Sequence, residues 1–419
     1  MNTAYKEVEN RKSHQTQDES ALEENRDEKN RIRIVLAGGG TGGHIYPAIG
    51  IAQALHRIDT HIDIVFIGGG DRIEASIVPQ QGFRFLPISV EGFPRRLTWK
   101  WFPVIFRVFQ GLLKSFKYLK ELQPDVVIGT GGYVSGPVLY AASLIGIPIA
   151  IQEQNATPGL TNRILARRAK AAFLALPQER QRFPNHIVQV TGNPIRPSIT
   201  NFPRRKETYE KFALSEKKKT VFVMGGSQGA QAVNNVMIDA CPLIAQSANC
   251  VDSQEKTDET KYKLDDRSIN IQVVHQTGKK DIDKVRESYQ KHAIPCLVQP
   301  FFDPIEEIYS IADLMICRAG GMTVSEVTAC GIPAIFIPLP AAVGNDQVQN
   351  ATTVADVRAA VVIKQEEITP EKLVNQLFRI LSDDTLYKEM KVNSSSFGKP
   401  FASDTIAESI LRLAAEDIT

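Results

Sequence analysis

Two stretches of this chain repeat the same succession of an apolar run, a glycine-rich loop and a segment of helical periodicity. The first covers residues 32–55 with the loop 38–44, and the second covers residues 220–240 with the loop 225–229. A glycine loop between a buried strand and a helix is typical of parallel βα units, which are stable within a sheet covered by helices. The sequence therefore predicts an α/β chain with two similar, Rossmann-like halves.

Further apolar runs, each bounded by glycine or proline, continue the alternation in both halves. They cover residues 62–67, 126–128 and 147–151 in the first half and residues 271–275, 296–298, 314–317 and 334–337 in the second. Because helix-period segments separate these runs, we expect two doubly wound parallel sheets with helices on both faces. Such sheets bind ligands at the carboxyl ends of their strands, so we expect the two domains to face a central cleft.

The predicted domains are residues 31–196 and residues 197–399. Residues 1–30 carry mixed charge with one aromatic side chain, and we expect a solvated tail because this composition cannot form a core. A hydrophilic stretch at 251–270 predicts a surface loop. The helical pattern at about 400–419 is compatible with packing on either domain, including the first.

The charge of the chain is nearly balanced, but its distribution is uneven. There are 49 basic and 47 acidic residues, which give a net charge of +2. Residues 94–120 hold seven basic residues and no acidic one, so the rest of the chain sums to −5. A protein held on nucleic acid by a general positive field is thereby excluded, and we expect no nucleic acid among the partners.

The cysteines and the hydropathy indicate a protein of the reducing cytoplasm. Five cysteines form no CxxC pair, and the odd number argues against a disulfide framework. No run of 18 apolar residues is present, so we expect no membrane span. The polar N-terminus also lacks the pattern of a secretory signal.

The glycine loops predict a ligand that carries phosphate. Backbone N–H groups in such loops approach phosphate closely, and the following helix contributes a favourable dipole. The loops 38–44 and 225–229 are joined by a third at 129–132. Neither of the first two loops is a Walker A loop, and neither is followed by the acidic residue of a dinucleotide fingerprint.

Two titratable side chains stand next to these loops. His44 lies where the first loop meets its helix, and the helix dipole there favours a neutral ring that can accept a proton. Glu326 follows the apolar run 314–317, where a carboxylate can bind a ribose diol. A structural histidine and a helix-capping glutamate are the alternatives. Asp281 and Asp283 form an Asp-x-Asp at a helix start, which we do not interpret as a metal site.

The basic segment 94–120 also contains both tryptophans of the chain. Its cations are Arg95, Arg96, Lys100, Arg107, Lys114, Lys117 and Lys120, and its aromatics are Trp99, Trp101, Phe102, Phe106, Phe109, Phe116 and Tyr118. This composition is compatible with single-stranded nucleic acid, with an anionic membrane surface, or with a helix whose aromatics are core. The composition alone does not distinguish the membrane surface from the helix with core aromatics.

Nine motifs follow one another in the order of a known family. They are the His44 loop, Gly131-Gly-Tyr-Val-Ser-Gly-Pro137, Gln152-Glu-Gln-Asn155, Thr191-Gly-Asn-Pro-Ile-Arg196, Gly225-Gly-Ser-Gln-Gly-Ala230, His275-Gln-Thr-Gly-Lys279, Cys317-Arg-Ala-Gly320, Thr323-Val-Ser-Glu326 and Asp346-Gln347 with Asn350-Ala351. Over about residues 31–415 the chain resembles the MurG family of glycosyltransferase family 28. The resemblance implies a GT-B fold and an inverting transferase. We expect metal-independent chemistry without a cofactor, because the glycine loops, Arg196 and the helix dipoles can stabilise the charge of the leaving UDP. The donor would be UDP-N-acetylglucosamine, and the acceptor would be the C4 hydroxyl of undecaprenyl-pyrophosphoryl-MurNAc-pentapeptide.

The resemblance also implies the site residues. The expected base is His44, and the loop near the sugar and diphosphate contains Thr41, Gly42 and Gly43. The expected donor contacts are Asn155, Arg196 and Ser227, with the backbone of Phe302 on the uracil and Gln347 on the sugar hydroxyls. The nucleoside would be surrounded by Gly321, Met322, Thr323, Val324, Ser325 and Glu326, with Glu326 on the ribose. The lipid-linked acceptor favours the membrane reading of residues 94–120, on the cytoplasmic side of the inner membrane. The triplet Asn345-Asp346-Gln347 departs from the Asp/Asn-His-Gln of many relatives.

Three other functions remain as alternatives. One is a GT-B transferase acting on another lipid, such as diacylglycerol. Another is a UDP-N-acetylglucosamine epimerase, which would need carboxylates around C2 and C3, whereas the first loop offers only His44. The last is a non-catalytic module that binds nucleotide sugars.

Overall fold

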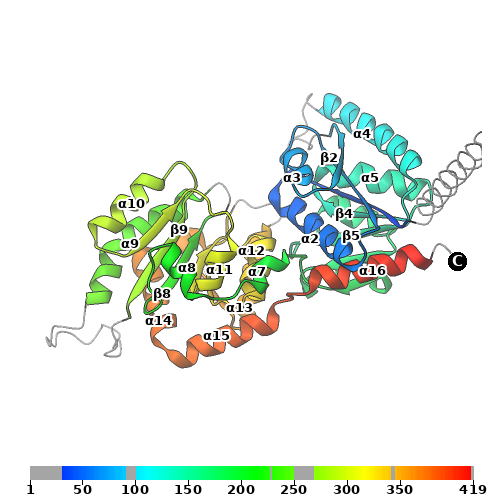
Figure 1. Cartoon of the computed structure of the whole chain (residues 1–419). Coiled ribbons are helices and arrows are strands. Elements are labelled where there is room, and N and C mark those ends of the chain that lie inside the picture. Colours follow the sequence, from blue (N-terminus) through cyan, green and yellow to red (C-terminus); the bar gives the residue numbers. More distant parts are fainter. Residues whose placement is uncertain (1–30, 91–100, 227–228, 250–268, 341–344, 417–419) are drawn as a thin grey trace, which may run out of the picture.

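The computed structural model describes residues 31–90, 101–226, 229–249, 269–340 and 345–416. Two separate parallel sheets, each packed between helices, form two lobes (Figure 1). The prediction of an α/β chain with two Rossmann-like halves is confirmed. The predicted tail 1–30 and nearly all of the predicted loop 251–270 lie outside the described residues.

The N-terminal sheet has seven parallel strands in the order β3-β2-β1-β4-β5-β6-β7. Its elements are β1 (Arg33–Gly38), α2 (Gly42–Ile58), β2 (Asp63–Gly69), α3 (Glu74–Gln80), β3 (Arg84–Ile88), α4 (Trp101–Leu122), β4 (Val126–Gly131), α5 (Gly132–Leu144), β5 (Ile149–Glu153), α6 (Leu160–Leu165), β6 (Ala171–Leu174) and β7 (Val188–Val190). The order reverses at the pair of β1 and β4. A crevice forms at the carboxyl ends of strands at such a reversal, so the loops after β1 and β4 face each other.

The C-terminal sheet repeats this plan with six parallel strands in the order β10-β9-β8-β11-β12-β13. Its elements are α7 (Pro197–Asn201), α8 (Lys206–Lys211), β8 (Lys219–Met224), α9 (Gln231–Asn249), β9 (Ile271–Gln276), α10 (Ile282–Lys291), β10 (Cys296–Gln299), α11 (Glu306–Ile311), β11 (Leu314–Cys317), α12 (Gly321–Ala329), β12 (Ala334–Phe336), α13 (Asp346–Asp356), β13 (Ala360–Val362), α14 (Pro370–Ser382) and α15 (Asp384–Phe397). The reversal lies between β8 and β11. The loops after these two strands therefore face the cleft.

The two faces of the N-terminal sheet have separate cores. One core contains side chains of α4, α5 and α6 together with Phe183 and Ile187. The other contains side chains of α2 and of the last helix, α16 (Ala402–Glu416). Because buried parallel strands meet helices on both faces, their sequences are continuous apolar runs instead of alternating ones.

Helix α16 returns from the second lobe and packs on the first. Ile406 and Ile410 are completely buried in the core of α2, and Arg57 forms a 2.5 Å ion pair with Asp404. The Ser403 hydroxyl donates to the carbonyl of Ile195 at 2.9 Å. The chain therefore passes between the lobes twice, once before α7 and once after α15.

Helix α2 begins earlier than its periodicity predicts. We expected the helical pattern from Pro47, but the structure starts the helix at Gly42, inside the glycine loop. Glycines contribute nothing to a hydrophobic pattern, so the first turn is invisible in the sequence. The short strands β3, β6, β7 and β13 were likewise not predicted, and β7 is mostly exposed.

Candidate active site

The first and third glycine loops pack against each other at the carboxyl ends of β1 and β4. A Cβ atom on Gly38 would lie 2.0 Å from the Thr130 hydroxyl, and one on Gly132 would lie 2.2 Å from the carbonyl oxygen of Gly39. No side chain fits at either position. The glycines therefore allow the two backbones to approach, and this contact shapes the N-terminal side of the site.

Glu74 fixes the first loop, and the sequence analysis missed it. Its buried carboxylate accepts hydrogen bonds from Gly40 N at 3.1 Å and from Gly69 N at 2.9 Å. A carboxylate that accepts from two backbone amides holds both of them firmly. No sequence signal identifies Glu74, because its partner loop is 34 residues away and is adjacent only through the pairing of β1 with β2.

His44 is held by one of its two ring nitrogens. Nδ1 lies 3.1 Å from the carbonyl oxygen of Thr130 and 3.1 Å from Gln154 Oε1. A carbonyl oxygen can only accept, so Nδ1 carries the proton of the neutral ring and Nε2 keeps its lone pair. The Thr130 hydroxyl donates to the carbonyl of His44 at 2.8 Å and fixes the first turn of α2. This arrangement leaves Nε2 to act as a base.

A chain of buried side-chain amides leads away from His44. Gln154 accepts from His44, and its amide nitrogen donates to Gln152 Oε1. Gln152 Nε2 donates to Asn193 Oδ1 at 2.8 Å. All three amides are at most 3% exposed. Each amide accepts a hydrogen bond on one side and donates one on the other, so all hydrogen bonds in this chain of amides run from His44 toward Asn193.

The amide chain ends on α12 in the C-terminal domain. Asn193 Nδ2 donates to the carbonyl of Gly321 at 3.1 Å and to the Ser325 hydroxyl at 3.0 Å. A Cβ on Gly321 would lie only 2.4 Å from the carbonyl oxygen of Gln154, so the helix start touches the N-terminal domain directly. The candidate base and the predicted nucleoside-binding helix are thus connected through four hydrogen bonds.

A second interdomain contact involves α13. Asn350 Oδ1 accepts from Ala156 N at 2.8 Å, and its amide nitrogen lies 3.3 Å from Asn155 Oδ1. The Thr157 hydroxyl donates to Gln349 at 2.8 Å. The predicted donor residue Asn155 therefore lies where the two domains meet.

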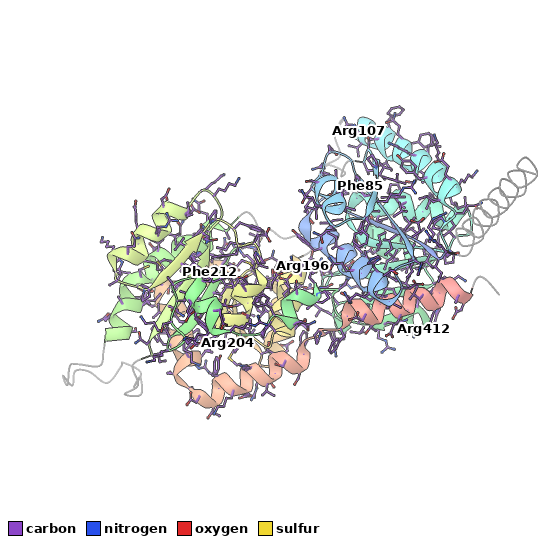
Figure 2. All side chains as sticks on the ribbon, in the orientation of Figure 1. Phe85, Arg107, Arg196, Arg204, Phe212 and Arg412 are labelled. Atoms are coloured by element: carbon purple, nitrogen blue, oxygen red, sulfur yellow. The ribbon has the colours of Figure 1, made fainter. Side chains whose placement is uncertain are left out.

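Arg196 lies at the junction of the two lobes (Figure 2). Its guanidinium stacks over the ring of Tyr46 at 5.4 Å from the centroid, and Nη2 is 4.0 Å from Glu306 Oε2. That carboxylate oxygen is buried without a hydrogen-bond partner among the described residues. The junction therefore offers a cation and an unsatisfied acceptor on the side of the cleft that carries α12.

Glu326 lies in α12, close to this junction. The Tyr309 hydroxyl donates to Glu326 Oε2 at 2.8 Å. Burial raises the pKa of the Glu326 carboxyl, while the bond from Tyr309 and the charge of Arg196 act in the opposite direction. Glu326 therefore keeps one oxygen without a bond to Tyr309 and can accept from a ligand hydroxyl.

Asp346 opens α13 and was not predicted as a site residue. Burial raises the pKa of its carboxyl to about 6, and the negative charge of Glu153 from the other domain adds to the shift. Its Oδ1 atom is buried and has no hydrogen-bond partner within the described part of the chain. The neighbouring Gln347 accepts from Leu339 N at 3.0 Å.

The remaining predicted residues fall into three groups. The N-cap and first turn of α2 contain Thr41, Gly42 and Gly43. The first turn of α12 contains Gly321 with Met322, Thr323, Val324 and Ser325. The third group is Ser227, which lies outside the described residues. Phe302 is buried, and its backbone N–H donates to Gln276 Oε1 at 3.0 Å. Gln276 also donates to the carbonyl of Gly226, so it connects the second glycine loop to Phe302.

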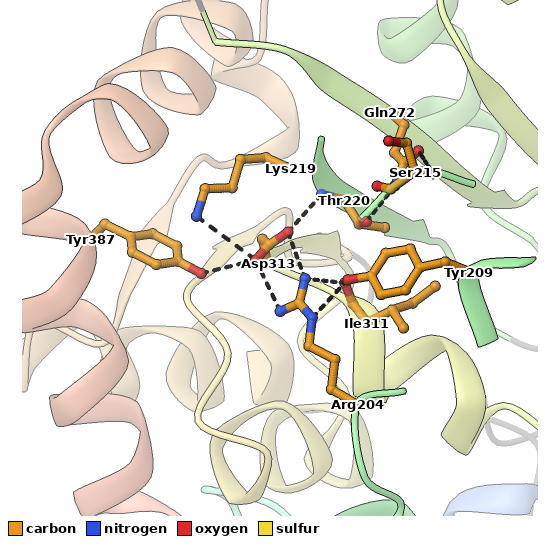
Figure 3. Close-up of polar contacts among 9 residues, drawn as sticks. All are labelled: Arg204, Tyr209, Ser215, Lys219, Thr220, Gln272, Ile311, Asp313 and Tyr387. Carbon is orange, nitrogen blue, oxygen red and sulfur yellow. Dashed lines mark hydrogen bonds and ion pairs between the residues drawn. The ribbon is translucent and has the colours of Figure 1, made fainter. Parts of the chain in front are cut away.

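A polar cluster at the opposite end of the C-terminal sheet is structural (Figure 3). Asp313 accepts from the backbone of Thr220 at 2.8 Å and from both terminal nitrogens of Arg204 at 3.1 and 3.2 Å. The Tyr387 hydroxyl reaches it from α15 at 3.4 Å. Because these residues stand at the amino ends of β8 and β11, the cluster fastens the connecting segment there and is remote from the cleft.

No group of three or more His, Cys, Asp or Glu side chains is arranged to hold a metal ion within the ranges given above. In the same part of the chain, no helix combines the length and apolar character needed to cross a bilayer. The pair Asp281 and Asp283 is engaged by Asn234 and Arg286, respectively.

Two lobes of this plan, with glycine loops and an arginine at their junction, define the GT-B architecture of enzymes that act on nucleotide sugars. The model of the glycosyltransferase family 28 N-terminal domain matches residues 34–174, and that of the family 28 C-terminal domain matches residues 220–406. The chain belongs to glycosyltransferase family 28.

Relatives and solved structures agree with this assignment. A UDP-N-acetylglucosamine–N-acetylmuramyl-(pentapeptide) pyrophosphoryl-undecaprenol N-acetylglucosamine transferase of Syntrophus aciditrophicus is 36% identical over 91% of this chain and 99% of that protein. The protein of the same name from Bacillus subtilis is 35% identical over 89% of this chain and 97% of its own length. The structure of Acinetobacter baumannii MurG matches with 30% identity and a TM-score of 0.69, covering 91% of this chain and 99% of the other.

The architecture is shared with other enzymes as well. A Neisseria meningitidis UDP-GlcNAc 2-epimerase matches with a TM-score of 0.63 over 91% of this chain and 100% of the other, at 12% identity. At that identity the likeness concerns the fold alone.

Proposed function

We propose that this chain transfers N-acetylglucosamine from UDP-N-acetylglucosamine to the C4 hydroxyl of undecaprenyl-pyrophosphoryl-MurNAc-pentapeptide, with inversion at the anomeric carbon. The acceptor oxygen attacks C1 of the donor sugar, and the bond from C1 to the UDP oxygen breaks as UDP leaves with the electron pair. The acceptor proton passes to Nε2 of His44. The family, the relatives and the motifs that surround the cleft support this function.

The observation that carries the mechanism is the orientation of His44. Its Nδ1 is occupied by the Thr130 carbonyl and by Gln154, so Nε2 is the nitrogen that can accept a proton. His44→Ala should lower kcat by about 10²–10⁴-fold with little change in UDP affinity. A variant that retains a near-normal rate would remove His44 from this role.

The donor is placed on the C-terminal side. We assign the ribose to Glu326 and the uracil to the backbone of Phe302, while Arg196 and the starts of α2 and α12 face the diphosphate. The unsatisfied oxygens of Glu306 and Asp346 support a ligand with several hydroxyl donors on this side. Asn155, Gln347 and Ser227 of the second glycine loop complete the proposed donor contacts.

Radiolabelled UDP-N-acetylglucosamine tests the function directly. The purified protein is incubated with the donor in the presence and in the absence of the lipid-linked acceptor. Sugar transfer that depends on the acceptor supports the proposal. Epimerised nucleotide sugar formed without acceptor, or transfer to diacylglycerol instead, would contradict it.

We further propose that the protein binds the cytoplasmic surface of the inner membrane through residues 94–120. Residues 94–100 lie outside the described residues, but the rest forms α4, whose Phe106 and Phe109 are 61% and 55% exposed. Phe116 and Tyr118 pack on the domain core instead. Exposed aromatics beside exposed lysines suit an anionic interface. Co-sedimentation with anionic vesicles should weaken when Arg107 and Lys114 are changed to Glu.

A further inference from the structure

A pocket in the C-terminal domain lies at the amino ends of β11 and β12. It has a volume of about 210 Å³, and its walls come from α7, α11, α15 and the turns that precede the two strands. The loops that face the cleft follow the carboxyl ends of β8 and β11, so the pocket lies at the other end of this sheet. It is therefore separate from the proposed donor site, and its volume suits one small molecule.

The pocket does not favour a cation. Asp313 is the only carboxylate among the described residues of its walls, and its side chain is 5% exposed. Both of its oxygens already accept from the protein: Arg204 bonds to each of them, Thr220 N donates at 2.8 Å and the Tyr387 hydroxyl donates at 3.4 Å (Figure 3). The charge of Asp313 is thus balanced within the fold.

Two cations of the walls keep donors for a ligand. Arg204 donates from Nε, from both N–H groups of Nη2 and from one N–H of Nη1, so the second N–H of Nη1 has no partner among the described residues. Lys391 on α15 is exposed and forms no ion pair with any residue that the structure describes. Because Asp313 balances one of these two charges, the walls carry one surplus positive charge. Guanidinium and ammonium groups bind phosphate by charge-assisted hydrogen bonds, so the pocket favours an anionic group.

The hydroxyl groups of the walls indicate a second part of the ligand. The hydroxyls of Thr200, Ser310 and Tyr387 donate to two backbone carbonyls and to Asp313, respectively. Each hydroxyl oxygen keeps its lone pairs, so toward a ligand it can only accept. The apolar wall residues Phe202 and Ile332 suit the carbon skeleton of a ligand. A molecule with several hydroxyl donors and one anionic group satisfies all of these walls.

Three helices connect the pocket to the proposed donor site. Helix α7 follows Arg196 directly and places Ile199 in the pocket wall. Helix α12 carries Glu326 and ends just before the wall residue Cys330. In α11, the wall residue Tyr309 donates its hydroxyl to Glu326 Oε2 at 2.8 Å. The carboxylate that we assign to the ribose is therefore one hydrogen bond away from the pocket wall.

We propose that this pocket binds a small sugar phosphate, with the phosphate on Arg204 and Lys391 and the sugar on the three wall hydroxyls. Binding there tightens the donor site, because the ligand fixes the parts of α7 and α11 and the end of α12 that lie in the pocket. The pocket itself does not depend on the proposed reaction, whereas the coupling rests on the proposed placement of the donor ribose on Glu326.

The probe that tests the pocket is glucose 6-phosphate. Titration calorimetry of the full-length protein measures its binding in the presence of saturating UDP, which occupies the donor site. Lys391→Gln should weaken this binding at least about tenfold, because it removes a charged donor. Lys388→Gln, at an exposed position of the same helix outside the pocket walls, should change it by less than about twofold. Glucose and inorganic phosphate should each bind at least about tenfold more weakly than glucose 6-phosphate, because each satisfies only part of the walls.

A second pair of variants fills the pocket without a change of charge. Thr200→Phe places a large side chain in the pocket wall and should abolish binding of glucose 6-phosphate. Ser198→Phe, at an exposed position of the same helix outside the walls, should bind the probe as the wild type does. Thermal unfolding checks that each variant is folded.

The affinity for UDP measures the coupling. Glucose 6-phosphate should tighten UDP binding about fivefold in the wild type and in Lys388→Gln, and it should have no effect in Lys391→Gln. Competition for the donor site would weaken UDP binding instead, so the direction of the change separates the two sites.

The pocket assignment fails if glucose 6-phosphate does not bind in the presence of UDP, or if Lys391→Gln and Thr200→Phe bind it as the wild type does. Inorganic phosphate that binds as tightly as glucose 6-phosphate would show that the sugar part of the assignment is wrong. An unchanged affinity for UDP would remove the coupling. Sugar transfer is not measured in these titrations, so failure of the proposed function in its own assay would leave the pocket assignment standing.

Discussion

His44 receives its orientation from a chain of buried amide side chains. The ring of His44 is hydrogen-bonded to Gln154, and Gln154 is hydrogen-bonded to Gln152. Gln152 in turn donates to Asn193, which donates to the start of α12. We infer that a correctly docked α12 keeps the neutral ring in the form with a free Nε2. The chain of amides would thus connect the donor-binding helix to the base.

Asn193→Asp tests this connection with almost no change of shape. The carboxylate can still accept from Gln152, but it cannot donate to Gly321 or Ser325 and faces a carbonyl oxygen instead. We expect kcat to fall about 10- to 100-fold, with a smaller change in the KM for the acceptor.

The control for Asn193→Asp is Asn201→Asp, at an exposed position at the end of α7. Because the amide chain acts through His44, the pH profile of kcat should also change in the Asn193 variant. A loss of folded protein with an unchanged kcat per folded molecule would contradict the positioning role.

Asp346 makes a prediction about stability and pH. Its folded-state pKa of about 6 lies above the ordinary value of 3.8 for an aspartate, so the folded protein binds a proton in this window that the unfolded chain releases. Stability is therefore lost as the pH rises through about 4 to 6. Asp346→Asn should be more stable than the wild type by about 1 kcal/mol at pH near 8, after allowance for solvent screening, and this gain should shrink toward pH 5.

Urea unfolding at the two pH values measures this difference. Asp356→Asn, at the exposed end of the same helix, serves as the control and should show no such dependence. An equal effect of Asp346→Asn at both pH values would show that removal of the charge is not the cause.

At the residue scale, the sequence predicted the site residues that lie at the ends of strands, but not all of the buried side chains that hold them in place. His44 and Glu326 follow a glycine loop or an apolar run, so their position at a strand end is readable. Glu74 gives no such signal, because its partner loop comes into reach only through strand pairing. Gln152 follows the apolar run 147–151, but nothing in the sequence indicates its bond to Asn193. Asn193 was noted within a motif, but its bonds to α12 depend on the docking of two domains.

At the scale of elements, the start of α12 makes a close contact with the N-terminal domain. Gly321→Ala places a Cβ 2.4 Å from the Gln154 carbonyl oxygen and 3.0 Å from Asn155 Oδ1, both of which are held in place. The helix must move away, and we expect kcat/KM for the donor to fall about 10- to 100-fold.

Gly320→Ala provides a matched control one residue away. The nearest atom to its new Cβ is the Thr323 hydroxyl oxygen at 4.0 Å, and the backbone there has φ −62°, which alanine adopts readily. Steady-state kinetics of both variants measure kcat/KM for the donor. Equal losses in the two would mean that glycine is needed for the helix cap and not for the contact.

Elements that carry a hydrophobic pattern were predicted, and elements without one were not. The strands β1, β2, β8 and β11 are continuous apolar runs, because helices cover both of their sides. The edge strand β7 has two exposed residues out of three, and its sequence is indistinguishable from that of a loop. The first turn of α2 consists of glycines and His44, so its helical character depends on the packing of Thr130 against it.

At the scale of the whole molecule, α16 belongs to the stability of the N-terminal domain although it ends the chain. Ile406→Ala and Ile410→Ala should each lower the free energy of unfolding of that domain by about 2–4 kcal/mol, because both side chains are completely buried against α2. The C-terminal domain should unfold as in the wild type.

Denaturant unfolding, followed with and without UDP-N-acetylglucosamine, separates the two domains if the ligand stabilises only the C-terminal one. Val392→Ala on α15, where the side chain is 63% exposed, is the control. If the isoleucine variants destabilised the C-terminal domain instead, the packing of α16 on the first lobe would not matter for its stability.

The two passages of the chain between the lobes touch each other. A Cβ on Gly192, in the first passage, would lie 2.4 Å from the Cβ of Lys399 in the second. Two bodies joined at two distant points could turn only about the line between those points. Here the two passages lie side by side, so we infer that they act as one pivot and that the hydrogen bonds between the domains, not the covalent chain, limit the direction in which the lobes can turn.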